Sequence, residues 1–148
     1  MNPENLRDMA NLLNEGALNY SVFLRCYSTP MTSEASSQQL VQAMLGVSAE
    51  VQHVQPVATE ALLAEVEASL AYAGDSGAGP SQSIIQSERF KLLLSRLLTD
   101  TRVTSEMATK KEQFWLKEGH PAYPVFWDFA YLFTGSKEAT VFIGSSSD

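Results

Sequence analysis

The chain has a single cysteine, only two histidines and few charged side chains, and each scarcity excludes a class of protein. Because Cys26 has no second cysteine to pair with, a disulfide-held scaffold is excluded. Charged residues make up 18% of the 148 residues and apolar residues 45%, a composition too apolar for intrinsic disorder. No apolar run approaches the roughly 18 residues of a membrane span, and residues 1–12 have no signal-peptide core. We therefore expect one cytoplasmic domain, residues 1–148, that does not contact a membrane.

The net charge of -7 lies entirely in the first part of the sequence. Residues 1–83 hold two arginines against nine carboxylates, whereas residues 84–148 hold eight basic and eight acidic side chains. The sequence lacks the basic stripe that is typical of nucleic-acid binders, so we expect no nucleic-acid partner. The acidic half would suit a basic protein partner, or it serves only as a solvated surface that keeps the protein soluble.

Motifs that hold phosphates or metals are also missing. The stretch Gly77-Ala78-Gly79 lacks the later glycine and the lysine of a phosphate-binding loop. Two distant histidines and one cysteine make a zinc site a poor hypothesis. Glu50 and His53 have the spacing of carboxylate metal sites in helical bundles, but only one copy occurs. We expect neither a metal nor a cofactor.

Apolar residues recur at steps of three and four along most of the chain, a spacing typical of amphipathic helices. The pattern predicts about five helices: 3–26 with a cap at Asn2 and Pro3 at its first position, a second capped at Thr32 or Ser33 and stopped by Pro56, a third starting at Thr59, a fourth that follows Ser81 or Ser83, and a fifth over 104–118. Residues 74–80 hold three glycines and a proline and predict a flexible loop. Two small domains on either side of it would each have a thin core, so a single bundle is favoured.

Residues 124–144 depart from the helical pattern. Residues 125–133 are apolar on both faces of a strand except at Asp128, residues 134–138 are polar, and residues 139–143 are strongly strand-forming. A β-hairpin over 124–144 is the simpler interpretation, and a helix over 124–133 followed by an extended tail is the alternative. The predicted fold is therefore mainly α and bundle-like, becoming α+β if the hairpin forms.

Such a hairpin would need cover on its second face. A lone two-stranded hairpin is marginal in water, and each large side chain left uncovered forgoes about 1.5–3 kcal/mol of burial. We expect that face or edge to meet another chain, most simply in a two-fold homodimer, although a helix of the same chain could cover it instead. The expected binding residues are aromatic: Trp115, Trp127, Phe129, Tyr131 and Phe142.

One polar group of residues could support chemistry. His120, Tyr123 and Asp128, with Glu118 nearby, combine an imidazole, a phenol and carboxylates among aromatic side chains. Apolar surroundings shift pKa values and so favour acid–base catalysis, and they also suit a small-ligand pocket or a purely structural role. The sequence therefore predicts a small binding or regulatory module that acts through protein contact as a homodimer. The alternative is a small enzyme or ligand-binding protein with His120, Tyr123 and Asp128 at its site.

Overall fold

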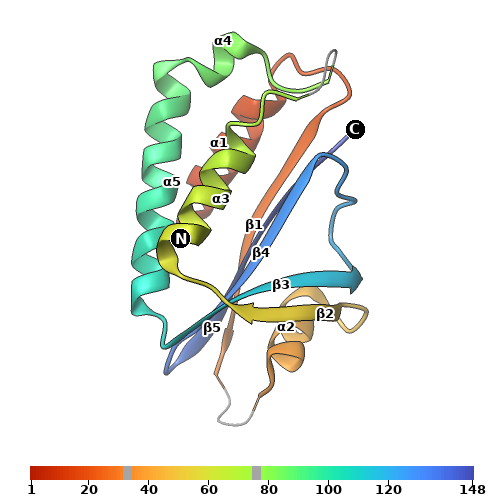
Figure 1. The fold of residues 1–148 in the computed structure, drawn as a ribbon, viewed down its shortest axis with the longest axis vertical. Helices are drawn as coiled ribbons and strands as arrows, with labels where there is room; N and C mark the ends of the chain where they lie inside the picture. Colours follow the sequence, from red (N-terminus) through yellow and green to blue (C-terminus); the bar gives the residue numbers. More distant parts are fainter. Residues whose placement is uncertain (32–34, 75–77) are drawn as a thin grey trace.

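Five antiparallel strands form a single sheet, which helices cover on both faces (Figure 1). The computed structural model describes residues 1–31, 35–74 and 78–148. The strands are β1 (Ser21–Pro30), β2 (Glu50–Pro56), β3 (Lys110–Glu118), β4 (Trp127–Thr134) and β5 (Glu138–Ser147), in the order β1-β5-β4-β3-β2. The helices in these ranges are α1 (Pro3–Asn14), α2 (Ser37–Leu45), α3 (Thr59–Leu70), the short α4 (Gln82–Ile85) and α5 (Glu88–Met107). The prediction of a mainly α helical bundle is wrong, because the fold is α+β.

Three segments that the apolar spacing predicts as helical are strands. They are β1 and β2, which begin inside the first and second expected helices and run past their ends, and β3, which lies within the expected helix 104–118. Short apolar segments satisfy both the helical and the strand period, so spacing alone cannot separate them. The chain also turns where the predicted helices would continue, because Gly16 and Asn19 have φ of 68° and 49°, and Gly46 has φ of 109° at the end of α2. Glycine adopts such angles readily, and asparagine does so more often than other residues with a side chain.

The predicted starts of two helices are confirmed. The Asn2 side chain accepts a hydrogen bond from the Glu4 N–H at 2.9 Å, Pro3 is the first residue of α1, and Thr59 is the first of α3. The expected caps Thr32 and Ser33, and residues 75–77 of the expected loop, lie outside the described residues. Among the helices of the described ranges, none combines the length and the apolar character needed to cross a membrane.

The sheet separates two apolar cores. Helices α1, α3 and α5 cover one face, where Phe129, Tyr131 and Phe142 meet helix residues such as Leu13 and Leu97 (Figure 1). Helix α2 packs on the other face, against side chains that include Leu132, Val141 and Ile143. Strands β4 and β5 form an antiparallel hairpin that lies inside the sheet, with β3 and β1 as its outer neighbours. The chain's own elements therefore cover both faces of the aromatic tail.

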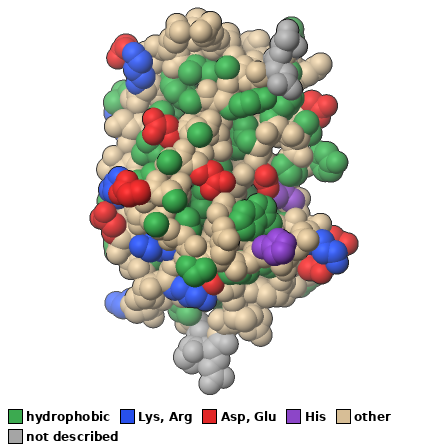
Figure 2. Space-filling model, viewed as in Figure 1, with side chains coloured by type: hydrophobic (Ala, Val, Ile, Leu, Met, Phe, Trp, Pro, Cys, Tyr) green, Lys and Arg blue, Asp and Glu red, His purple; other side chains and the backbone are tan. Residues whose placement is uncertain are grey.

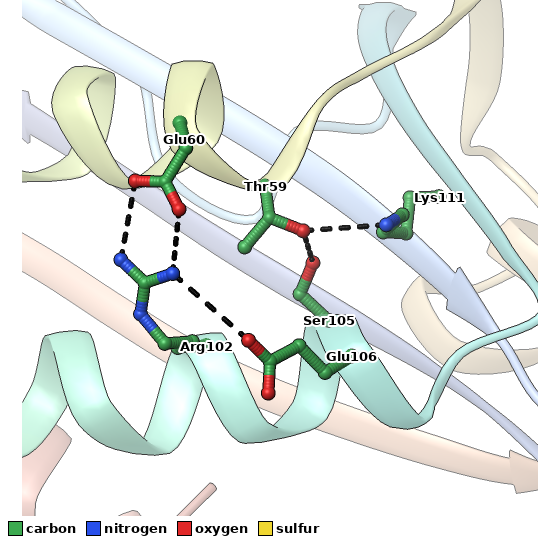
Figure 3. Close-up of polar contacts among 6 residues, drawn as sticks. All are labelled: Thr59, Glu60, Arg102, Ser105, Glu106 and Lys111. Atoms are coloured by element: carbon green, nitrogen blue, oxygen red, sulfur yellow. Dashed lines mark hydrogen bonds and ion pairs between the residues drawn. The ribbon is translucent and has the colours of Figure 1, made fainter.

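Polar contacts fix α3 against α5 and β3 (Figure 3). The Arg102 guanidinium donates to both carboxylate oxygens of Glu60, at 2.6 and 3.1 Å, and these hydrogen bonds lower the pKa of Glu60. Both side chains are exposed to solvent, which weakens such a pair. Beneath them the Thr59 and Ser105 hydroxyls lie 2.7 Å apart, and Lys111 Nζ donates to Thr59 Oγ1 at 3.2 Å. The contact between the Thr59 and Ser105 hydroxyls is better shielded from solvent than the ion pair between Arg102 and Glu60, because Ser105 is fully buried.

A second polar contact joins α3 to β4. The fully buried Tyr131 donates its hydroxyl to Glu65 Oε2, and Gln113 Nε2 donates to the same oxygen at 2.8 Å. Burial, followed by the neighbouring Glu65 carboxylate, raises the pKa of the Tyr131 phenol far above its usual value. The phenol therefore stays protonated and acts as a donor that holds α3 over the sheet.

Candidate functional site

No hydrogen bond or ion pair links the described residues that were expected to support catalysis, although the Asp128 carboxylate acts electrostatically on His120. His120 Nδ1 accepts a hydrogen bond from the Ala122 N–H at 3.0 Å, so the backbone of its own turn holds the ring. Burial lowers the pKa of His120, which favours the neutral imidazole. Tyr123 is 81% exposed, and Asp128 lies at the surface in β4. No hydrogen bond joins His120, Tyr123 and Asp128, all of which lie within the described residues, so this arrangement supplies no proton relay.

The aromatic residues expected to bind a partner mostly lie in the core. Phe129, Tyr131 and Phe142 are at most 2% exposed, beneath α1, α3 and α5. Trp127 is half-buried and donates its indole N–H to the Tyr20 hydroxyl at 2.9 Å. Trp115 is half-buried too, with the His53 ring packed edge-on at 6.3 Å. A partner could reach the three core side chains only if helices left the sheet.

Unpaired backbone groups occur instead along the border strand β1, which among the described strands pairs with β5. In an antiparallel ladder, successive residues direct both backbone groups alternately towards the neighbouring strand and away from it. Met31 N–H donates to the Lys137 carbonyl of the β4–β5 turn at 2.9 Å, whereas Val22 N–H donates to the Asn14 side chain at 2.8 Å. Odd-numbered residues of β1 therefore bond β5, and even-numbered residues face away from the sheet.

Two side chains cap the first half of this outer edge. Asn14, the last residue of α1, accepts from the Val22 N–H, and Arg25 Nη1 donates to the Leu24 carbonyl at 2.9 Å. Between the Leu24 N–H and the Pro30 carbonyl, the remaining outward groups have no hydrogen-bond partner among the described residues. They are the N–H groups of Leu24, Cys26 and Ser28 and the carbonyls of Cys26, Ser28 and Pro30. We call Leu24–Pro30 the open segment.

The opposite border strand, β2, is less suited to pairing. Its register against β3 shifts on both sides of Val51, whereas the register of β1 against β5 runs without a shift. Bulges are features by which proteins keep sheet edges from pairing. The open segment is therefore the part of either sheet border that best fits an added strand.

A groove lies beside the open segment. It encloses about 900 Å³ between the start of α1, the end of α5, β1 and the β4–β5 turn. Its lining is apolar in part, with Met1, Val103, Met107 and Phe133, and carries polar atoms of Cys26, Ser28 and Thr140. Met107 is 78% exposed and Val103 50%, so apolar surface is available to an incoming chain. Cys26 is half-buried, and burial raises the pKa of its thiol, so it lacks the character of a nucleophile.

The side-chain charges on the face drawn in Figure 2 offer no comparable site. On the face shown in Figure 2, carboxylates are interspersed with lysines, arginines and apolar side chains and form no continuous acidic patch. Within the described ranges, no three His, Cys, Asp or Glu side chains are grouped so that they could hold a metal ion. Sequence reasoning missed the open segment because backbone groups form it, and only the strand order shows which of them lack partners.

The arrangement thus consists of a sheet border with unpaired backbone groups and a partly apolar groove beside it. Comparison of the chain with protein family models, with curated proteins and with solved structures finds no match in any of the three.

Proposed function

We propose that the protein is a binding module that takes up an extended segment of another polypeptide by strand addition along Leu24–Pro30. The observation that carries the proposal is the set of unpaired N–H and carbonyl groups on this half of β1, next to a capped half. In strand addition, main-chain hydrogen bonds give affinity, and pockets for alternate side chains give specificity. This function keeps the expected action through protein contact and moves it from aromatic side chains to a backbone edge.

The groove supplies the pockets that such binding requires. Cys26 and Ser28 both face outward with their backbone and line the groove with their side chains. Side chains of an added strand that point to the same face would lie beside them and reach Met107 and Phe133. Ligand segments with apolar residues at alternate positions therefore fit this site best.

A proline at position 28 tests the proposal. Ser28 is exposed and its N–H points away from β5, so Ser28→Pro removes one outward donor and no bond of the protein's own ladder. The matched control is Ser28→Ala. Both variants lose the 2.9 Å contact between the Ser28 hydroxyl and Thr140 Oγ1, but only the proline variant also loses the backbone N–H. The probes are ten-residue peptides selected from a random display library against the parent protein.

We expect Ser28→Pro to lower the affinity for these peptides by roughly tenfold or more, and Ser28→Ala to leave that affinity nearly unchanged. Bound peptides should also slow hydrogen exchange of the Cys26 and Ser28 amides. Circular dichroism of both variants checks that the fold is kept. Peptides that bind the parent and Ser28→Pro equally well, with no protection of those amides, would refute strand addition.

A further inference from the structure

The open segment has a pattern of donors and acceptors that is complementary to itself. Its outward N–H groups belong to residues 24, 26 and 28, and its outward carbonyls to residues 26, 28 and 30. A two-fold axis through Tyr27 places residue 24 opposite residue 30 of a second copy, and residue 26 opposite residue 28. Every donor of one copy then faces an acceptor of the other.

We infer that the strand added to β1 is β1 of a second copy of this chain, antiparallel and centred on Tyr27; this inference rests on the proposed function. Three N–H groups of each copy donate to three carbonyls of the other, so six hydrogen bonds form and no group of the open segment stays unpaired. A two-fold dimer of this kind is isologous, because the same patch serves both copies. The two five-stranded sheets become one continuous sheet.

The two residues that interrupt the outward pattern support this register. The Leu24 carbonyl is already used by Arg25, and the residue opposite it is Pro30, which has no N–H to donate. The dimer therefore requires no hydrogen bond between the Leu24 carbonyl and Pro30, and Arg25 can keep its hydrogen bond to that carbonyl. In the neighbouring register, centred on Cys26, the Ser28 N–H would face the Leu24 carbonyl, which Arg25 already occupies. Only four hydrogen bonds would then form between the two copies, instead of six. The pairing centred on Tyr27 therefore satisfies more of the edge.

Engineered cysteines test the register. In antiparallel strands, Cα atoms of a pair without mutual hydrogen bonds lie about 4.5 Å apart, within reach of a disulfide. Position 27 is such a pair in the proposed dimer, so Tyr27→Cys in a Cys26→Ser background should form a disulfide dimer under mild oxidation. The control is Thr29→Cys in the same background. In the proposed dimer the two Cα atoms at position 29 are offset by four residues along the strands, roughly 14 Å, so no disulfide should form.

The parent protein and Ser28→Pro supply the measurements that need no new cysteine. Sedimentation of the parent should show a dimer, and its Cys26 and Ser28 amides should exchange slowly. Ser28→Pro removes one donor from each copy, two from each dimer, and should raise the dissociation constant roughly 10- to 100-fold. If Tyr27→Cys does not fold, the exchange and sedimentation data still decide the matter.

The outcomes separate this inference from the proposed function. A parent that stays monomeric at about 100 µM while it binds library peptides through the Ser28 N–H overturns the homodimer and leaves strand addition standing. A monomer that binds no peptide overturns both. A dimer that Ser28→Pro does not weaken, or that links through position 29 rather than 27, overturns the inferred interface.

Discussion

Replacement of Tyr131 by phenylalanine tests whether the contact between α3 and β4 stabilises the fold. The change removes one hydroxyl from a side chain that is 0% exposed and leaves the ring volume nearly unchanged. What disappears is the hydrogen bond to the Glu65 carboxylate, while Gln113 continues to donate to the same oxygen at 2.8 Å. A hydrogen bond to a charged group contributes about 1.5–3 kcal/mol. Because Glu65 is only half-buried and keeps one donor, we expect a loss of about 1.5 kcal/mol, at the lower end.

The same contact predicts a pH dependence with a definite sign. Burial and the Glu65 carboxylate raise the pKa of Tyr131 in the folded protein above the value near 10 of an unfolded chain. The stabilisation is therefore complete below about pH 10 and is lost above it, where the unfolded chain ionises and the folded one does not. The advantage of the parent over Tyr131→Phe should shrink by about 1.4 kcal/mol for each pH unit above 10.

Urea unfolding followed by tryptophan fluorescence, at several pH values between 7 and 11, measures both effects. Tyr123→Phe is the matched control, since that hydroxyl is on a side chain that is 81% exposed and should contribute almost nothing. A Tyr131→Phe variant as stable as the parent at pH 7, or a difference between them that stays constant from pH 9 to 11, would refute the reasoning.

Two further predictions concern the core and the turn after β3. Gly144→Ala should cost about 1–3 kcal/mol in thermal or urea unfolding, because its new Cβ would lie 2.5 Å from Phe129 Cζ and 2.7 Å from Leu24 Cδ2; an unchanged stability would contradict this packing. Burial lowers the pKa of His120 in the folded protein, so its contribution to stability is present above the unfolded value near 6.5 and falls as the pH drops below it. The parent should lose stability between pH 7 and 5 relative to His120→Asn, and parallel curves for the two proteins would argue against a buried neutral imidazole.

Local signals in the sequence were sufficient for some elements. Asn2 and Pro3 mark the start of α1 because capping and a fixed φ act within one turn of helix. The aromatic and β-branched tail points to strands, and β4 and β5 are strands. In each case the residues that decide the structure are neighbours in the sequence.

Where the outcome depends on distant residues, the sequence was a poor guide. Apolar residues in β1 and β3 are spaced as on a helix, yet β1 forms its ladder with β5 at the other end of the chain. Helix α5 likewise ends at Met107. The side chains of Glu112, Phe114 and Leu116 alternate along β3 and face α2, a pattern that can be recognised only when the position of α2 is known. Tertiary pairing overrides a local period when an apolar run is short.

The position of β1 also has a consequence for synthesis. Its first residue, Ser21, contacts Ser147, 126 residues later, so the strand is complete long before its partner strand β5 exists. At about 5–20 residues per second, a ribosome leaves β1 without a neighbour for roughly 6–25 s. During that interval α1 and α2 are available to cover the two faces of β1, but its backbone groups that face β5 stay unpaired, and ladder formation must then close a long loop, which makes folding slow. The strand order thus makes the pairing of β1 with β5 a late step of folding.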